Sequence, residues 1–300
     1  MKILVAGGSG FLGSAFANSM RSAGHQVWIL TRKEPNHSNE IHWDGNTAGE
    51  WTETLADMDA VVNMTGFGLE HWPWTKQQKQ RFYDSRVRPG VALVSAITQL
   101  QHRPGVMLQI SGINYYGTHG NTVADEWTSP GNDFLAQLTV QWEASTQPIE
   151  ELGVRRIIAR TAVVLDSHAG LFPRMVFPVR LFVGGPLGGG MQAMPWIHLA
   201  DQTGALRLLL EDDKAHGVYN LISPTPTSNA TFMRAIAEAL HRPYWLPTPA
   251  FLLKAVLGEM SMLMVEGHYS QPRRLLEYGY KFQYPTIEQA LWDLFGKENS

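Results

Sequence analysis

The chain opens with the stretch MKILVAGGSGFLG, residues 1–13, and this stretch decides the fold. The apolar run at residues 3–6 predicts a short buried strand. Phe11 and Leu12 begin an apolar pattern of helical spacing. A strand, a glycine turn and a helix in this order are typical of the phosphate-binding turn of dinucleotide-binding proteins.

Each glycine of this turn has an expected role. Gly7 allows the tight turn, Gly10 lets backbone N–H groups approach a pyrophosphate, and Gly13 lets the helix pack on the strand. A glycine turn with a purely structural role is the alternative interpretation. We expect the dinucleotide to be bound by Gly7, Ser9, Gly10, Phe11, Leu12 and Gly13.

The end of the second predicted strand indicates which dinucleotide is bound. An NAD-binding fold normally places an acidic residue there to hold the ribose 2′-hydroxyl. This chain has Thr31, Arg32 and Lys33 instead. A guanidinium fork and a second cation suit a 2′-phosphate, so the sequence predicts NADP(H) as cofactor. The alternative is that both cations are solvated surface residues.

The remaining pattern predicts the fold class and the domains. Apolar runs near residues 41–44, 60–64, 106–111 and 154–160 alternate with helical stretches near 75–100 and 134–152. This predicts an α/β fold, a Rossmann-type doubly wound parallel sheet. Beyond residue 165 the chain becomes rich in glycine and proline, which predicts a smaller, discontinuous C-terminal substrate lobe. The expected division is 1–165 with 191–222 returning to it, and 166–190 with 223–300 as the lobe.

Composition excludes several classes of protein. A net charge of -3 gives no basic field for nucleic acid, and the absence of cysteine excludes disulfides and thiolate metal sites. We find no zinc spacing and expect no metal. The apolar stretch near the C-terminus is broken by Lys254 and Glu259, and the first strand begins at Lys2. We therefore expect a cytoplasmic protein without membrane contact, acting on a small molecule; homo-oligomerisation is left open.

Several further motifs follow in a recognisable order. They are TRK (31–33), NMTG (63–66), DSRV (84–87), YYG (115–117), RTAVVL (160–165), GGPLGGG (184–190) and WIHLAD (196–201). Together with the N-terminal turn, they resemble the atypical epimerase-like branch of the extended short-chain dehydrogenase/reductase superfamily. That branch includes proteins described as nucleoside-diphosphate-sugar epimerases or cell-division-inhibitor-like proteins. The resemblance runs nearly end to end.

The chain departs from the superfamily at the residues that carry its chemistry. The resemblance implies an active-site Tyr-x-x-x-Lys pair, yet no lysine stands four residues after any tyrosine. The helix expected to carry the pair has Phe134, Leu135, Leu138 and Thr139 instead. The chain also reads TGFG at 65–68, which lacks the branch's carboxylate, and Gly-Met-Gln at 190–192 in place of Gly-Arg-Gln.

Other side chains are candidates for the missing chemistry. Ser111 ends a parallel strand and resembles the superfamily's serine that binds a substrate carbonyl. Tyr115 and Tyr116 follow it, and either phenol could replace the lost tyrosine if its pKa is lowered from about 10. The alternative is that these rings only pack. In the lobe, His198 could act as an acid or hold a structural place, and Trp196 could border a substrate pocket.

Four residues are expected at the cofactor besides the glycine turn. Thr65 and Gly66 follow a buried strand, and Arg86 on the next helix could contact a phosphate or ribose. A surface arginine paired with Asp84 or Glu70 is the alternative. Asp44 could accept from the adenine amino group or simply form a turn.

Two aromatic and apolar groups are left open. Trp72, Trp74 and Trp196 could border an aromatic pocket or anchor their loops. Met260, Met262 and Met264 could line an adaptable pocket or fill a core. The sequence thus leaves two functions: an NADP-dependent oxidoreductase or epimerase-like enzyme acting on a small carbonyl or sugar-nucleotide substrate with a displaced proton donor, and a non-catalytic NADP(H)-binding sensor or regulatory protein.

Overall fold

Seven parallel strands form the central sheet of the computed structural model, which describes residues 1–117 and 123–296. The strand order is β3-β2-β1-β4-β5-β6-β9. The strands are β1 (Lys2–Ala6), β2 (Gln26–Thr31), β3 (Glu40–His42), β4 (Ala60–Asn63), β5 (Val106–Gly112), β6 (Arg155–Thr161) and β9 (Gly217–Leu221). The predicted doubly wound sheet is confirmed, and the order reverses between β1 and β4, where such sheets bind ligands.

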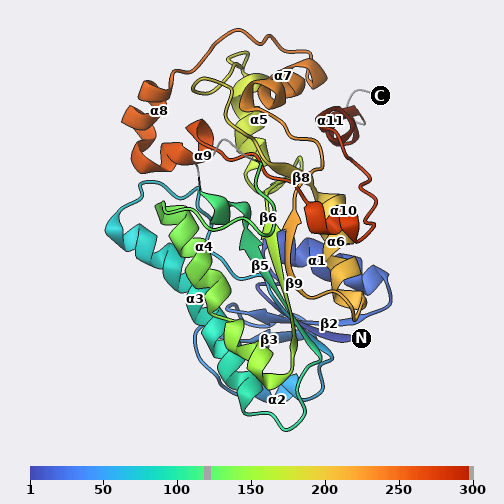
Figure 1. Cartoon of the computed structure of the whole chain (residues 1–300). Helices are drawn as coiled ribbons and strands as arrows, with labels where there is room; N and C mark the ends of the chain where they lie inside the picture. The colour runs from blue at the N-terminus through green and yellow to red at the C-terminus, as the bar shows by residue number, and fades with distance from the viewer. Residues whose placement is uncertain (118–122, 297–300) are drawn as a thin grey trace.

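Helices cover both faces of the sheet (Figure 1). One face carries α1 (Phe11–Ser22) and α6 (Leu199–Glu211). The other carries α2 (Thr52–Leu55), α3 (Lys76–Thr98) and α4 (Phe134–Ala144). Because both faces are covered, a central strand such as β1 is an apolar run without alternation, and its residues 3–6 are all fully buried.

The fourth helix is shorter than the sequence pattern predicts. The expected helix over 134–152 ends at Ala144, and a 3-10 helix, η2 (Gln147–Leu152), follows it. Pro148 explains why the helix ends, because proline has no backbone N–H for a helical hydrogen bond and its ring disfavours helical geometry in Gln147. A second 3-10 helix, η1 (Ile113–Tyr116), follows β5.

The remaining elements lie mostly beyond the carboxyl ends of the strands (Figure 1). They are β7 (Val163–Leu165), β8 (Trp196–His198), α5 (Phe172–Arg180), α7 (Asn229–Ala239), α8 (Ala250–Leu257), η3 (Gly258–Ser261), α9 (Met262–Val265), α10 (Arg273–Glu277) and α11 (Ile287–Phe295). Strands β7 and β8 pair in parallel as a separate two-stranded sheet.

The C-terminal part has a core of its own. Phe172, Phe232 and Phe295 are fully buried together in a cluster distinct from those around the large sheet. Segment 191–222 contains β8, α6 and β9, and β9 pairs with β6 as the last strand of the sheet. The division into 1–165 with 191–222, and 166–190 with 223–300, stays a prediction. No described helix has the length and apolarity needed to cross a membrane.

Candidate cofactor and substrate site

The glycine turn forms a tight cradle between β1 and α1. Gly7 has φ +78°, and a Cβ atom there would lie 2.8 Å from the carbonyl carbon of Met64. A Cβ atom on Gly13 would collide with the carbonyl oxygen of Gly7. The Gly10 N–H donates to that oxygen at 3.0 Å, and α1 begins at Phe11 with no acidic residue in its first turn. The first backbone N–H groups of this helix therefore suit a pyrophosphate.

Two residues of the turn reach the cavity described below. Phe11 and Leu12 both line it, and the Phe11 ring packs against Gly170 of the loop before α5. A Cβ atom on Gly170 would lie 2.8 Å from this ring. Ser9 is exposed at the tip of the turn. The cradle and the cavity are thus continuous.

The cations after β2 are available to a phosphate. Thr31 is buried, and its hydroxyl oxygen accepts from the Lys33 backbone N–H at 3.2 Å. Arg32 and Lys33 are exposed, and neither is in an ion pair with any residue in 1–117 or 123–296. The Arg32 stem lies beside Gly45, where a Cβ atom would be 3.6 Å from Cδ. Two unpaired cations and no acid fit a 2′-phosphate.

Asp44 lies two residues beyond β3 and is occupied by its own turn. Its Oδ1 accepts from the backbone N–H groups of Asn46 at 2.7 Å and Thr47 at 2.9 Å, while Oδ2 accepts from the Thr47 hydroxyl. Although burial opposes the effect, these hydrogen bonds hold the pKa of Asp44 below its usual range. The geometry favours the turn-forming interpretation over contact with adenine.

The turn after β4 rests on a buried arginine. Thr65 donates through its backbone N–H and its hydroxyl to Oδ1 of the buried Asn63, at 3.2 and 2.7 Å. Arg86 is 8% exposed and donates to the carbonyls of Phe67 and Phe82 at 2.9 and 3.2 Å. Burial lowers the pKa of Arg86 to about 10, against the attraction of Glu70. A Cβ atom on Gly66 would lie 3.7 Å from the Arg86 guanidinium, so this charge lies directly under the turn.

The alternative of a surface arginine at position 86 is contradicted, because Arg86 is buried. Asp84 pairs with Arg88 at 3.0 Å instead. A buried cation beneath the turn, with backbone carbonyls as its acceptors, is consistent with a contact to the cofactor. That contact stays a prediction for Thr65, Gly66 and Arg86.

A cavity of about 600 Å³ lies where the carboxyl edge of the sheet meets the C-terminal elements. This size is within the range of small-molecule sites. Residues from the glycine turn, β6, η1, α5 and the segment 248–268 line it. Its polar side chains are few: Glu70, Asn114, Thr161, Arg174, Asn229, Thr248, Glu266 and His268.

The helix that should carry the Tyr-x-x-x-Lys pair presents no titratable group to this cavity. Leu135 lines the cavity, and Thr139, four residues later, faces Gly112 at the end of β5. The Thr139 hydroxyl donates to the Leu135 carbonyl at 2.7 Å, which occupies its proton. The Tyr-x-x-x-Lys pair that the sequence lacks has thus no replacement on this helix.

Ser111 belongs to a buried network of charges. Its hydroxyl donates to Oε1 of Glu143 at 2.7 Å, and both carboxylate oxygens of Glu143 accept from Arg160, each at 2.8 Å. Despite its burial, Arg160 has a raised pKa because of this bidentate pair. Ser111 is 3% exposed and does not line the cavity.

The two tyrosines extend this network. The Tyr116 hydroxyl accepts from Arg160 at 3.0 Å and donates to Oδ1 of Asn220 at 2.8 Å. Burial raises the pKa of Tyr116 to about 12, against the influence of Arg160. The Tyr115 ring packs on the Arg160 guanidinium, 3.3 Å from the ring centroid. The cation beside both rings is Arg160.

Neither tyrosine lines the cavity. The Tyr116 phenol, whose pKa is raised and whose proton is donated to Asn220, is in addition a poor acid for a substrate elsewhere. The geometry therefore favours the packing interpretation for Tyr115 and Tyr116.

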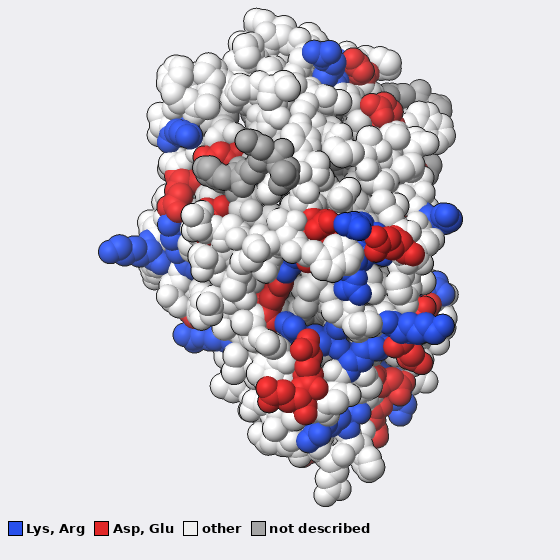
Figure 2. All heavy atoms as spheres, viewed as in Figure 1, with Lys and Arg blue, Asp and Glu red and all other residues white. Residues whose placement is uncertain are grey.

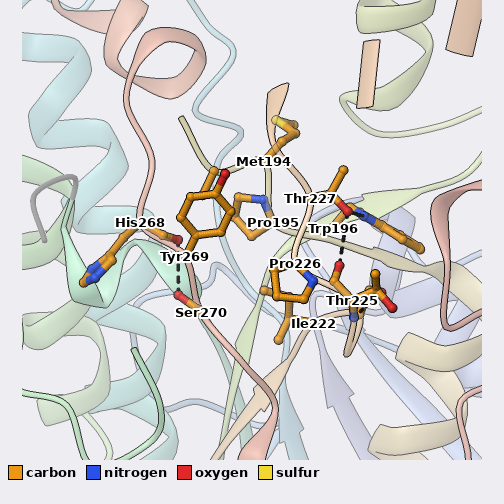
Figure 3. A pocket seen from close by; sticks show the side chains of 12 residues that line it. Met194, Pro195, Trp196, Ile222, Thr225, Pro226, Thr227, His268, Tyr269 and Ser270 are labelled. Atoms are coloured by element: carbon orange, nitrogen blue, oxygen red, sulfur yellow. Dashed lines mark hydrogen bonds between the residues drawn. The ribbon is translucent and has the colours of Figure 1, made fainter. Parts of the chain in front are cut away.

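Trp196 is a buried anchor and does not line the 600 Å³ cavity. It is 1% exposed, and its Nε1–H donates to the Thr227 hydroxyl at 3.1 Å (Figure 3). The small hollow beside it has a volume of only about 10 Å³. Trp74 is likewise buried and donates to the Leu69 carbonyl at 2.9 Å, whereas Trp72 is exposed.

His198 caps α6. Its Nδ1 accepts from the Ala200 N–H at 3.2 Å, and its Nε2 lies 3.5 Å from Oδ2 of Asp293. Burial lowers the pKa of His198, against the attraction of Asp293, Asp201 and Asp166. It does not line the cavity, so the structural interpretation is favoured.

Sequence reasoning assigned none of the cavity's polar side chains to the site, and Glu70 and Asn114 are two of them. Glu70 folds back over Gly68, where a Cβ atom would collide with its carboxylate, so a carboxylate is present although the tetrapeptide 65–68 has none. Asn114 lies on η1, directly after β5. Position alone could have found Asn114, since it follows the carboxyl end of a parallel strand. Met260, Met262 and Met264, left open above, line the cavity.

A glycine cradle at the switch point, cations at the ribose end and an adjoining cavity define a dinucleotide-binding protein of the short-chain dehydrogenase/reductase type. The model of the NAD dependent epimerase/dehydratase family matches residues 3–221, and that of a domain of unknown function, DUF1731, matches residues 248–294. The epimerase family protein Mb2239 of Mycobacterium bovis is 35% identical over 290 residues, covering 96% of each chain. The mouse epimerase family protein SDR39U1 is 34% identical over 299 residues, covering 98% of this chain and 99% of its own.

A solved structure agrees with these relatives. The crystal structure of human epimerase family protein SDR39U1 (isoform 2) with NADPH superposes with a TM-score of 0.91 at 32% identity, covering 99% of both chains. The chain belongs to the NAD dependent epimerase/dehydratase family of extended short-chain dehydrogenase/reductases. The resemblance seen in the sequence is confirmed.

Proposed function

We propose that this protein is an NADP(H)-dependent oxidoreductase that acts on a carbonyl compound in the 600 Å³ cavity. The observation that carries the proposal is the continuity of the glycine cradle with the cavity through Phe11 and Leu12. The unpaired Arg32 and Lys33 favour NADP(H) over NAD(H), and the human relative was crystallised with NADPH. When bound, NADPH supplies a hydride to the carbonyl carbon while the carbonyl oxygen takes up a proton, which yields an alcohol and NADP⁺.

The chain's own residues would orient the substrate and exchange the proton. Asn114 can donate its amide N–H to the carbonyl oxygen at the edge of the sheet. Glu70 lines the cavity beside the cofactor turn at 65–68 and can exchange a proton with that oxygen. We assign the proton-exchanging role to Glu70 in place of Tyr115 or Tyr116, because neither phenol lines the cavity.

A non-catalytic NADP(H)-binding regulatory protein is the second candidate function. The apolar face that Leu135 presents to the cavity favours it, because the usual proton donor has no replacement on that helix. An epimerase without net redox change is a variant of the first candidate and would use the same residues.

Cofactor choice is tested by calorimetry with NADPH and NADH. Arg32→Ala should weaken NADPH binding about 10- to 150-fold through loss of a charge-assisted contact of about 1.5–3 kcal/mol, and should leave NADH binding unchanged. Lys281→Ala removes another exposed cation and serves as the control. Equal affinity of the wild type for both dinucleotides would contradict the choice of NADP(H).

Turnover is tested by NADPH oxidation with ketones, aldehydes and quinones. We expect Glu70→Gln to lower kcat at least tenfold, about 1.4 kcal/mol, while Ser111→Ala, Tyr115→Phe and Tyr116→Phe retain most of it. Loss of kcat in a folded tyrosine variant, with Glu70→Gln active, would return the donor role to the tyrosines. Absence of turnover with NADPH binding intact would support the regulatory function.

A further inference from the structure

We infer that the substrate is an apolar carbonyl compound with a hydrocarbon chain and not a sugar nucleotide; this inference rests on the proposed function. The lining of the cavity carries it. Six of the chain's 12 methionines line this one cavity: Met175, Met194, Met233, Met260, Met262 and Met264. Methionine side chains are flexible and adapt to apolar ligands of irregular shape, and they offer few hydrogen bonds to a sugar.

The charges of the cavity point the same way. Among its described lining residues, Arg174 is the one permanent cation and Glu70 and Glu266 are the two carboxylates; Glu266 lies 3.9 Å from Lys254, which does not line the cavity. A sugar nucleotide carries a doubly charged diphosphate, which proteins bind with several cations or backbone N–H groups. A lining with one cation and two carboxylates disfavours binding of an anionic diphosphate but does not disfavour binding of a neutral ligand.

The segment from α8 to α9, residues 250–265, forms an apolar wall of the cavity. Leu253 and Leu257, four residues apart on α8, line the cavity together with Met260 and Met264. On the outer side of α8, Phe251 is 69% and Val256 67% exposed, and α8 has no buried residue. Figure 2 shows few charged side chains on the upper part of the molecule, where α8 lies, and many over the sheet domain below.

This wall packs on the sheet domain, since Met260 is buried in an apolar cluster with Trp74 and Leu135, and two polar links add to this packing. Lys79 donates to Glu259 at 2.6 Å, and the Gln192 amide donates to the Met264 carbonyl at 2.8 Å. Helices that are apolar on all sides are normally buried. Here the inner side of α8 instead faces the cavity, so a hydrocarbon chain there would be covered by Leu253 and Leu257.

The test is calorimetric binding of straight-chain 2-alkanones from six to twelve carbons, with UDP-glucose as the comparison ligand, with and without NADPH. Each added methylene should tighten binding by up to about fourfold until the cavity is filled, in proportion to the apolar area buried. Tighter binding of UDP-glucose than of the ten-carbon ketone, or an affinity that does not change with chain length, would overturn the inference.

Variants on the two sides of α8 localise the binding. Leu253→Asp should weaken binding of the ten-carbon ketone at least tenfold, whereas the matched Val256→Asp on the outer side should change it less than twofold. Leu257→Asp gives a second lining variant should the first fail to fold. Equal losses in the inner and outer variants would contradict binding in the cavity.

NADPH affinity measured on the same samples separates the two proposals. Intact NADPH binding without ketone binding overturns the substrate class alone. Ketone binding without NADPH binding overturns the proposed oxidoreductase and leaves the apolar site in place.

Discussion

Glu143 and Arg160 form a buried ion pair at the ends of neighbouring elements, with 2.8 Å between Arg160 Nε and Glu143 Oε1. Their side chains are 12% and 3% exposed, so both charges are largely removed from water. A buried ion pair is tolerated when its geometry is bidentate and its remaining polar atoms have hydrogen-bond partners. Here Ser111 donates to Glu143, and Tyr116 accepts from Arg160. The network fixes the ends of β5 and β6 beneath the cavity.

Glu143→Ala should strongly destabilise the protein. It leaves the buried Arg160 without its counter-charge, which costs about 3–5 kcal/mol in the free energy of unfolding. Urea denaturation followed by circular dichroism measures this. The control is Arg273→Ala, since that side chain is 53% exposed and its solvent-screened ion pairs should contribute little to the free energy of unfolding. Equal effects of the two variants would contradict the structural role of the network.

The lowered pKa of His198 predicts a dependence of stability on pH. Because the folded state holds its pKa below the unfolded value of 6.5, the neutral form contributes stability that is present above pH 6.5. This contribution is lost as the pH falls through the folded pKa, with a slope of at most about 1.4 kcal/mol per pH unit.

His198→Asn should reduce this loss of stability below pH 6.5, because asparagine retains an acceptor at the helix cap and does not titrate. Urea unfolding at several pH values between about 4.5 and 8 measures this loss, because that range includes the pKa of an unfolded histidine, about 6.5. His37→Asn, at an exposed position, is the control and should leave the slope unchanged. A wild-type slope in the His198 variant would contradict the prediction.

Local sequence patterns predict cofactor residues more directly than catalytic ones. Gly7, Gly13 and Arg32 are recognised from their position beside a strand, because local geometry determines what each can do. The roles of Ser111 and Tyr116 depend on Glu143 and Asn220, which lie 32 and 104 residues away. No local pattern could reveal these partners.

At the scale of elements, the turn between β1 and α1 admits no side chain at Gly13. Gly13→Ala would force the added methyl group against the Gly7 carbonyl oxygen and displace the helix N-terminus. We expect NADPH affinity to fall at least tenfold, about 1.4 kcal/mol, by calorimetry. Gly105→Ala, whose Cβ would meet only an atom 3.8 Å away, should leave it unchanged. Retained affinity in Gly13→Ala would show that the cradle is not the phosphate site.

Helix boundaries show where the pattern of a sequence is ambiguous. The apolar spacing over 134–152 continues beyond Ala144 although the helix does not, because Pro148 interrupts the backbone hydrogen bonds. In α8 the apolar residues are exposed on one side and line the cavity on the other, so burial could not be inferred from hydrophobicity alone.

For the whole molecule, NADPH should stabilise the folded chain even without turnover. A ligand that binds only the folded state adds about 2.7 kcal/mol at 100 times its dissociation constant. The melting temperature should therefore rise with NADPH concentration and less with equal concentrations of NADH. An unchanged melting temperature across the titration would contradict cofactor binding.

The fold class followed from the sequence because strands and helices alternate regularly up to residue 165. The cavity could not be predicted from the sequence, because its lining comes from segments as distant as Phe11 and His268. Only the packing of the C-terminal elements over the sheet brings Glu70, Asn114 and the methionines together.

The late position of β9 in the chain has a consequence during protein synthesis. Between Thr161, the end of β6, and Gly217, the start of β9, lie 55 residues. At about 5–20 residues per second, the ribosome takes roughly 3–11 s to supply them. Throughout that interval the backbone of β6 has no neighbour on the side that β9 later occupies. An unpaired strand edge invites pairing with other nascent chains, so β6 is where we expect chaperones to act on this protein.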